Sequence, residues 1–200
     1  SDEELASLFA YLASPRQTEL RATPLNASGF FDGKSLTRWE GDAAVWSVED
    51  GAIVGRTGGL ERNAFLRSAY ELGDFRLSLE VRLTGDVGNS GIQFRSRVTE
   101  DGDVAGYQAD IGPGWWGKLY EEHGRELLVE RGSSAVRPDD WNRYVIECRG
   151  TLVRTWINDE PCVDLDDPAG ARRGLIALQV HSGGQTEVRF RNLALELLEP

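Results

Sequence analysis

The stretch Phe75-Arg-Leu-Ser-Leu-Glu-Val-Arg-Leu83 decides the fold class, because apolar and polar side chains alternate along it without a break. In a β-strand, successive side chains point to opposite faces, so the apolar positions all fall on one face. One face of such a strand packs on a core and the other carries polar groups, which is typical of antiparallel sheets.

The same alternation recurs along the chain. Ile92, Phe94 and Val98 share a face opposite Gln93, Arg95 and Arg97, and the segments 107–111, 118–120 and 176–181 divide in the same way. Further strands are predicted at 44–48, 52–56, 127–131, 141–149, 152–157, 160–165 and 186–197, with turns at Asp50-Gly51, Gly150 and Asn158-Asp159. About a dozen strands and few helices predict an all-β sandwich or jelly roll of two packed sheets.

The N-terminal segment has a different pattern. Leu5, Leu8, Phe9 and Leu12 follow helical spacing within residues 1–14, and Pro15 would end that helix. We therefore expect an N-terminal helix and linker over 1–28, with the linker at 24–28, and one β domain over 29–200. The chain begins with Ser and no signal peptide precedes it, so we expect it to be trimmed from a longer protein.

Charge and cysteine content exclude several classes of protein. The 22 Lys and Arg against 33 Asp and Glu give a net charge of −11, which disfavours nucleic acid and anionic membranes as partners. No apolar run approaches the roughly 18 residues of a membrane span. The two cysteines form no CxxC motif, which disfavours structural zinc, iron–sulfur and covalent haem sites.

The predicted hairpins also separate the two cysteines. If Gly150 and Asn158-Asp159 are tight turns, Cys148 and Cys162 lie on strands with a third strand between them, about 9.6 Å apart. A disulfide requires Cα atoms within about 7 Å, so we expect two free thiols.

The polar faces of these strands are rich in side chains that make fixed, multidentate hydrogen bonds, which is typical of a sugar-binding face. They are Gln93, Arg95, Arg97, Gln108, Asp110, Lys118, Tyr120, Gln179 and His181. Trp115 and Trp116 lie in a glycine-rich loop between two of the strands, and exposed indoles stack on pyranose rings. A concave face with these groups would bind carbohydrate.

Successive motifs resemble the 3-keto-disaccharide hydrolase domain family over residues 29–198. They are Phe31-Asp-Gly-Lys-Ser-Leu-Thr-Arg-Trp39, Trp46-Ser-Val-Glu-Asp-Gly-Ala-Ile53, Asp74-Phe-Arg-Leu77, Asn89-Ser-Gly-Ile-Gln-Phe-Arg95, Gly106-Tyr-Gln-Ala-Asp-Ile111, Gly117-Lys-Leu-Tyr-Glu-Glu122, Trp141-Asn142, Gly174-Leu-Ile-Ala-Leu-Gln-Val-His-Ser-Gly183 and Val188-Arg-Phe-Arg-Asn-Leu193. One departure is Asn158-Asp159, where the family usually has Asn-Gly. Residues 1–14 also resemble the last helix of a class I cytochrome c domain.

The resemblance implies a concanavalin A-like jelly roll, an extracytoplasmic setting, and action on glycosides that are oxidised to a ketone at carbon 3. The separate resemblance of residues 1–14 implies an upstream cytochrome c-like domain. A 3-ketone acidifies the hydrogen on carbon 2, so that a base can remove it and the enolate can expel the aglycone, after which water adds. Such a site needs a base, an acid and a group that stabilises the enolate oxygen.

We assign these roles to side chains that the alternation places on the same polar face of the sheet. Asp110 and His181 are the base and acid candidates in unresolved order, and Arg95 and Lys118 are the candidates for enolate stabilisation. Glu80 is an alternative carboxylate, or the partner of an ion pair on a sheet face. The residues expected to bind substrate are Gln93, Gln108, Tyr120, Trp115, Trp116, Glu122, Gln179 and Arg97.

No cofactor is required for this chemistry, although Asp110, Glu122 and His181 have the side-chain types that bind a divalent metal. The main alternative is a non-catalytic, lectin-like carbohydrate-binding module, because this architecture hosts both functions. An ordinary glucanase would need two carboxylates about 5–9 Å apart, and no alternating acidic motif provides them. A structural adhesion domain is permitted by the charge but has no positive support.

Overall fold

The computed structural model describes residues 20–23, 27 and 29–199. The helix expected over 1–14 lies outside the described residues, as does most of the linker, so both stay predictions. Within the described part of the chain, no helix has the length and apolar character needed to cross a membrane.

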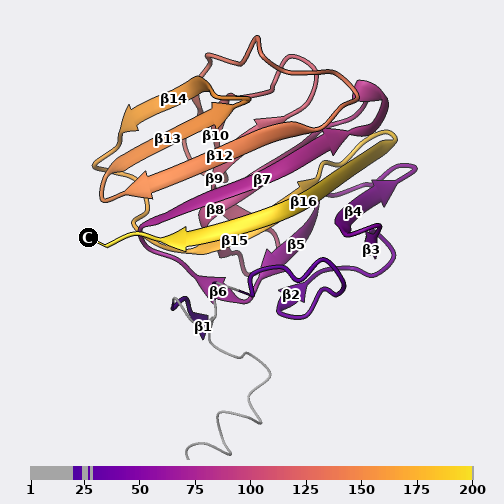
Figure 1. The fold of residues 1–200 in the computed structure, drawn as a ribbon, viewed down its shortest axis with the longest axis horizontal. Helices are drawn as coiled ribbons and strands as arrows, with labels where there is room; N and C mark the ends of the chain where they lie inside the picture. Colours follow the sequence, from indigo (N-terminus) through magenta and orange to yellow (C-terminus); the bar gives the residue numbers. More distant parts are fainter. Residues whose placement is uncertain (1–19, 24–26, 28, 200) are drawn as a thin grey trace, which may run out of the picture.

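Two antiparallel sheets of seven strands pack face to face and form a jelly-roll sandwich, with the second sheet in front in Figure 1. The first sheet has the order β11 (Glu126–Val129), β10 (Leu119–Glu122), β9 (Val104–Ile111), β8 (Ser90–Val98), β15 (Leu175–Val180), β5 (Ala64–Ser68) and β2 (Trp39–Glu40). The second has the order β14 (Glu160–Asp166), β13 (Leu152–Ile157), β12 (Asn142–Arg149), β7 (Phe75–Leu83), β16 (Thr186–Leu197), β4 (Ala52–Thr57) and β3 (Trp46–Glu49). A short parallel pair joins β1 (Leu20–Arg21) to β6 (Tyr70–Glu71), and one 3-10 turn, η1, covers Thr84–Asp86.

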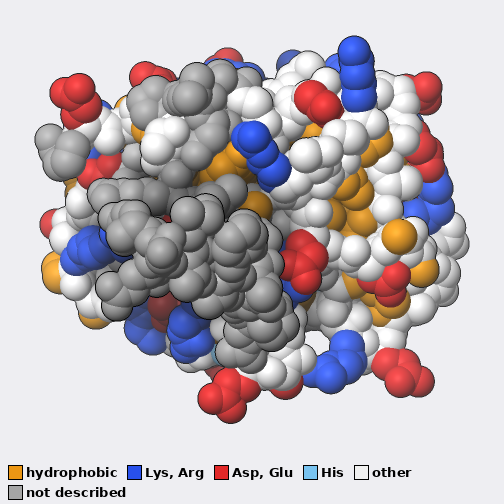
Figure 2. Space-filling view, turned by 90° about the horizontal axis from the view of Figure 1, so that it is seen from below, with side chains coloured by type: hydrophobic (Ala, Val, Ile, Leu, Met, Phe, Trp, Pro, Cys, Tyr) orange, Lys and Arg blue, Asp and Glu red, His pale blue; other side chains and the backbone are white. Residues whose placement is uncertain are grey.

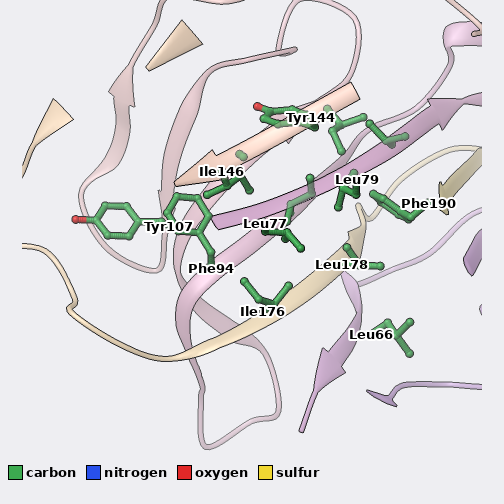
Figure 3. Packing of buried hydrophobic residues seen from close by; sticks show 14 of the residues in the cluster. Leu66, Leu77, Leu79, Phe94, Tyr107, Tyr144, Ile146, Ile176, Leu178 and Phe190 are labelled. Atoms are coloured by element: carbon green, nitrogen blue, oxygen red, sulfur yellow. The ribbon is translucent and has the colours of Figure 1, made fainter. Parts of the chain in front are cut away.

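The core lies between the sheets and is built from the alternating apolar positions. Along β7 every second side chain is buried, as the opening stretch predicts. Figure 3 shows Leu77 and Leu79 from β7 packed with Phe94 of β8 and Ile176 of β15. The alternation therefore sets which face of each strand meets the opposite sheet.

The longest strands match the sequence predictions within two residues, except that β9 begins three residues earlier than predicted. The turns are confirmed by positive φ values at Asp50, Gly150, Asn158 and Asp159. The sequence did not indicate β2, β5 or β6, because these segments are short or lack alternation. The cysteine prediction is confirmed: Cys148 on β12 and Cys162 on β14 flank β13, and both are buried and free.

One extra residue in β8 interrupts the alternation of that strand. The register between β8 and β9 shifts between Phe94 and Arg97, and Arg95 has a left-handed φ of 47°. Because of this β-bulge, the Arg95 side chain turns toward the second sheet instead of the outer face of the first. The expectation that Arg95 faces the concave side is therefore wrong.

Arg95 connects the two sheets through four acceptors. Its guanidinium donates to the carbonyls of Gly73, Gly150 and Ala171 and to Asp74 Oδ1, at 2.8–3.3 Å. The side chain is fully buried, so these contacts replace water around the charge.

The outer face of the first sheet, called the concave face below, has an ion pair between its two rims. Arg62, just before β5, lies at the rim where β8 begins, whereas Asp101 lies in the β8–β9 turn at the opposite rim. Even so, Arg62 and Asp101 form an ion pair at 3.1 Å across the concave face. Beneath it, Val104 packs in a small apolar cluster with Phe65, Leu175 and Ala177.

Elsewhere on the surface, acidic and basic side chains are interspersed, as Figure 2 shows for one face. Ion pairs account for much of this pattern. Arg56 of β4, for example, bonds to Glu49 and Glu187 on neighbouring strands. The net negative charge is therefore not gathered into one patch on the face shown.

We expect Arg95→Ala to lower the free energy of unfolding by about 3 kcal/mol, because it removes a fully buried side chain, the counter-ion of the half-buried Asp74 carboxylate and the donor to three carbonyls. Urea denaturation measures this change. Arg97→Ala on the same strand is the matched control, and since Arg97 is exposed it should cost less than about 0.5 kcal/mol. Equal losses in the two variants would contradict the assigned role of Arg95.

Candidate functional site

A pocket of about 330 Å³ lies on the concave face of the first sheet. This volume is at the small end of the range of about 300–1,000 Å³ that is usual for ligand sites. Its lining residues are Asn89, Gln108, Asp110, Trp115, Tyr120, Glu122 and His181. Six of these seven residues were predicted as site residues from the sequence, and Asn89 is the exception.

Strand register explains why these side chains meet. Gln108 and Asp110 alternate with buried core residues along β9, so both point to the concave face. Tyr120 of β10 lies directly opposite Gln108. His181 directly follows β15, and its backbone N–H donates to the Asn89 carbonyl at 3.1 Å.

A glycine makes room for the floor of the pocket. Gly91 of β8 lies opposite Asp110, and a Cβ at Gly91 would be 2.5 Å from the Gln108 Cδ atom. The Gln108 side chain therefore lies across the backbone of Gly91, which brings its amide to the carboxylate of Asp110. Any larger residue at position 91 would displace this amide.

A chain of hydrogen bonds leads to Asp110. Ser96 Oγ donates to Gln93 Oε1 at 3.1 Å, Gln93 Nε2 donates to Gln108 Oε1 at 2.8 Å, and Gln108 Nε2 donates to Asp110 Oδ1 at 2.7 Å. The other oxygen of Asp110, Oδ2, is buried and has no hydrogen-bond partner among the described residues. One oxygen of the carboxylate is thus fixed and the other is unpaired.

Burial raises the pKa of Asp110 to about 7. Only 3% of the residue is exposed, so the carboxylate loses most of its hydration. The Gln108 hydrogen bond and the Lys118 charge oppose this rise, while the charge of Glu122 adds to it. A carboxyl group that titrates near neutral pH is suited to exchange protons with a ligand.

Two other ionisable groups of the pocket are shifted in the same direction. Burial raises the pKa of Glu122, with the negative charge of Asp103 adding to the effect. Burial also raises the pKa of Tyr120, and nearby carboxylates reinforce this, so its hydroxyl stays protonated at neutral pH. Tyr120 is therefore a hydrogen-bond donor or acceptor in the pocket, not a phenolate.

His181 lies at the exposed edge of the pocket. Its Nδ1 atom is 2.7 Å from the Ser182 carbonyl oxygen, which accepts and cannot donate. Nδ1 must therefore carry a proton, which leaves Nε2 as the ring nitrogen without a partner in this contact. The loop is held in turn by Asn63 Oδ1, which accepts from the Ser182 backbone N–H.

The two adjacent tryptophans have different environments. Trp115 is 41% exposed and lines the pocket, with the Lys118 ammonium 5.0 Å from its ring centroid. Trp116 is buried in the core, and its Nε1 donates to Asp86 Oδ1 at 3.4 Å. Trp116 is therefore not a stacking residue, and Lys118 is held by Trp115 outside the set of lining residues.

Three further predicted site residues lie away from the pocket. Arg95 is held between the sheets by the bulge, and Arg97 is exposed one residue beyond it. Glu80 lies on the outer face of the second sheet, where its Oε2 accepts from Arg191 and Asn192 at 2.7 Å. The ion-pair interpretation of Glu80 is the correct one, and none of the three can reach a ligand bound at Asp110.

Gln93 and Gln179 lie on the concave face but do not line the pocket. Gln93 is fully buried between Ser96 and Gln108, so it contacts the site only through Gln108. Gln179, opposite Gly91, is also fully buried, and both polar atoms of its amide are without partners among the described residues. The expected direct contact of Gln93 with substrate is therefore wrong.

Asn89 is the lining residue that the sequence analysis did not single out. It precedes β8, outside the alternating segment, so parity could not place it. Its position between Gly88, which has a left-handed φ of 89°, and a strand start is the available signal for a polar residue at a rim.

The geometry does not provide a metal site at the expected residues. Among residues 20–23, 27 and 29–199, no three His, Cys, Asp or Glu side chains are arranged to hold one metal ion. Asp110, Glu122 and His181 line one pocket but do not form such a ligand set.

Residues 26–196 match the model of the 3-keto-alpha-glucoside-1,2-lyase-like domain. No curated protein sequence matches the chain. A protein from Parabacteroides distasonis assigned as a glycosyl hydrolase has a similar fold, with a TM-score of 0.65 and 18% identity over 89% of this chain and 98% of that one.

Two further solved structures are similar in fold. The carbohydrate-binding module CBM66 from Bacillus subtilis has a TM-score of 0.63 and 20% identity over 80% of this chain and 95% of that one. Alginate lyase A1-II′ has a TM-score of 0.59 and 13% identity over 86% of this chain and 98% of that one. At these identities the similarity shows the fold, which hosts both binding modules and enzymes.

Asp110→Asn should remove a pH dependence of stability. Because the pKa of Asp110 is raised from about 4 to about 7 on folding, the folded state binds the proton more tightly, and wild-type stability falls as the pH rises between these values. The variant lacks this loss, so its stability relative to wild type should improve by up to about 4 kcal/mol from about pH 4 to pH 8. Urea denaturation at stepped pH measures the difference.

The control is Asp166→Asn, which makes the same charge change at an exposed position on β14. The difference in unfolding free energy between Asp166→Asn and wild type should not change with pH in this way. Parallel stability curves for Asp110→Asn and wild type across this pH range would contradict a raised pKa.

Proposed function

The chain belongs to the family of 3-keto-alpha-glucoside-1,2-lyase-like domains, and from that premise we propose that it cleaves glycosides oxidised to a ketone at carbon 3. The reaction removes the proton on carbon 2, eliminates the aglycone from carbon 1 and adds water, which amounts to hydrolysis. The observation that carries the proposal is Asp110: a buried carboxyl group with a pKa of about 7 at a pocket on a concave sheet face.

The balance of the reaction requires one base and one acid. The base takes the carbon 2 proton, and the electron pair of that C–H bond delocalises onto the ketone oxygen as an enolate. When the ketone re-forms, a double bond forms between carbons 1 and 2, and the bond from carbon 1 to the aglycone oxygen breaks. The leaving oxygen takes a proton, and water then adds to carbon 1 while carbon 2 is reprotonated.

Asp110 fits the base and His181 fits the acid. Asp110 lies at the floor of the pocket, with Oδ1 held by Gln108 and Oδ2 free to accept the proton. His181 lies at the exposed edge, where an aglycone would extend toward solvent, and the Ser182 carbonyl occupies its Nδ1 so that Nε2 is left for the ligand. This division places the base beneath the sugar ring and the proton donor beside the leaving group.

The enolate oxygen needs hydrogen-bond donors. Arg95 and Lys118 do not line the pocket, so the donors available there are neutral: the Tyr120 hydroxyl and the Asn89 amide. Trp115 provides an exposed indole face for the sugar ring. Together with Glu122, these groups make up the proposed substrate contacts.

Direct hydrolysis by two carboxylates is the competing mechanism. Glu122 lies opposite Gly106 and Asp110 lies four residues further along β9, so their backbones are about 13 Å apart along the strand. Both side chains line the same pocket, so strand spacing alone does not decide between the mechanisms, and the match to a 1,2-lyase-like domain is what favours elimination.

The alternative function is a non-catalytic carbohydrate-binding module, which the fold shared with CBM66 favours. A binding face of this kind depends on several exposed indoles. Among the described residues, Trp115 is the one tryptophan that lines the pocket. A buried carboxyl group with a raised pKa is not needed for binding alone, so the enzyme is the better proposal.

We further propose an extracytoplasmic setting for the domain, on the strength of the family and the carbohydrate ligand. The upstream cytochrome c-like domain stays a prediction from the N-terminal sequence.

Asp110→Asn should lower turnover of a 3-keto glucoside at least about 100-fold, because an amide cannot accept the carbon 2 proton. Proton NMR in deuterated buffer measures aglycone release and deuterium at carbon 2 together. Wild type should show both signals, with or without a chelator, while Asp166→Asn should match wild type. Aglycone release without deuterium at carbon 2 would contradict elimination, and sugar line broadening without release would indicate a binding module.

The pocket should also discriminate by substrate charge. Asp110 and Glu122 line it and no Lys or Arg does among the described residues, so a 3-keto uronide would place a third carboxylate among them. A like charge about 6 Å away costs on the order of 3 kcal/mol in a partly buried site, so we expect about 100-fold lower kcat/KM for the uronide than for the glucoside.

Glu122→Gln should reduce the ratio of kcat/KM for the glucoside to kcat/KM for the uronide. Glu196→Gln makes an equal charge change on the second sheet and should leave this ratio unchanged. Steady-state kinetics on both substrates measures the ratio. Equal kcat/KM values for the two substrates in wild type would show that the charge of the pocket does not select the ligand.

A further inference from the structure

We propose that Ser96, Gln93 and Gln108 form a reversible hydrogen-bond relay, which pairs Asp110 in both its ionised and its protonated state. Ser96 and Gln93 are then positioning residues, since they act on Asp110 only through Gln108. The inference rests on the proposed function for its meaning in catalysis, but its tests do not require turnover.

The relay is almost completely buried. Relative exposure is 0% for Gln93, 1% for Ser96 and 3% for both Gln108 and Asp110. A buried donor or acceptor without a partner costs about 1–3 kcal/mol. In each state of Asp110, the relay must therefore supply a partner for the oxygen that it holds, Oδ1.

In the ionised state every donor points toward Asp110. The Ser96 hydroxyl donates to Gln93, the Gln93 amide to Gln108, and the Gln108 amide to Oδ1 of the carboxylate. This arrangement leaves Oδ2 as the oxygen with a free lone pair. Gln108 thus decides which oxygen of Asp110 is held and which is left unpaired.

In the protonated state of the ligand-free protein, the same side chains can form the chain of hydrogen bonds with the direction of every bond reversed. Asp110 donates from Oδ1 to Gln108 Oε1, Gln108 Nε2 donates to Gln93 Oε1, and Gln93 Nε2 donates to Ser96 Oγ. Both amides rotate by half a turn, which exchanges their nitrogen and oxygen with little movement of the side chain. The proton is then held on Oδ1, and no buried amide donor loses its partner.

Ser96 makes the reversal possible because its hydroxyl has a second set of acceptors. Its Oγ is 3.0 Å from the Phe94 carbonyl oxygen and 3.4 Å from that of Tyr107. When Gln93 becomes the donor, the Ser96 hydroxyl proton can turn to one of these carbonyls. The bulge places Ser96 beside them, and Gly106 leaves room, since a Cβ there would lie 2.5 Å from Ser96 Oγ.

Other ionisable groups face Asp110 and must be kept unchanged in any test. Lys118, Tyr120 and Glu122 face it from β10 and the loop before it. His181 shares the pocket, and Tyr144 of β12 interacts with it from the core. Ser96 and Gln93 are uncharged, so substituting them leaves these charges in place.

Neutron diffraction of the wild-type protein at about pH 5 and about pH 9 tests the relay directly, because deuterium positions identify amide nitrogens and hydroxyl donors. We expect the Gln93 and Gln108 amides to exchange nitrogen and oxygen between the two structures, with deuterium on Asp110 Oδ1 at the lower pH. The same amide orientation at both values would overturn the proposal.

Ser96→Ala provides a test in solution. Without the hydroxyl, the reversed relay leaves a buried Gln93 N–H unpaired, whereas the forward relay leaves only a carbonyl, which is the more tolerable defect. The pKa of Asp110 should therefore fall by about one unit. Carbon-13 NMR titration of labelled aspartate measures it, with the signal assigned by Asp110→Asn.

The matched control is Ser90→Ala. Ser90 is buried on the same strand and its hydroxyl donates to the Gln179 carbonyl at 2.6 Å, outside the relay. Its loss should lower stability without changing the pKa of Asp110. Equal shifts in the two variants, or a higher pKa in Ser96→Ala, would overturn the relay.

The relay and the proposed function can fail separately. A confirmed relay without deuterium at carbon 2 of a 3-keto glucoside would reject only the proposed reaction. Deuterium incorporation with fixed amides would reject only the relay. If both hold, the acid limb of the kcat/KM profile should move to lower pH in Ser96→Ala by the same shift as the titration.

Discussion

A single inserted residue in β8 determines how both faces of the first sheet are used. The bulge turns Arg95 inward, where its guanidinium bonds to Asp74 and to three backbone carbonyls at one end of the sandwich. It also turns Ser96 outward, onto the polar side of the sheet next to Gln93. Without the extra residue, a serine would replace the cation between the sheets and a charge would enter the buried polar face.

The buried polar face is the other consequence of this constraint. A concave sheet surface normally contacts water, but Gln93, Gln108, Asp110 and Gln179 are almost completely buried on it. The first three offset the loss of hydration by bonding to one another. Asp110 Oδ2 and the Gln179 amide are the exceptions, and both lie in the same row of the sheet on either side of Gly91.

The sequence predicted the strands and the side of the sheet well, because alternation directly reports which face is buried. Gln108, Asp110 and Tyr120 were placed correctly for this reason. Arg95 and Arg97 were misplaced because a bulge formed by ordinary residues has no marker such as Gly or Pro. Parity also cannot tell one sheet from the other, which is why Glu80 was assigned to the wrong surface. Within the loop before β10, Trp115 and Trp116 differ in burial only because of how the loop turns.

The ion pair between Arg62 and Asp101 links two distant parts of the first sheet. It joins the loop before β5 to the β8–β9 turn, so that the two rims of the concave face are bridged. Both side chains are largely exposed to solvent, so dissolved ions screen the attraction between them. The bridge between the rims therefore weakens as the ionic strength rises.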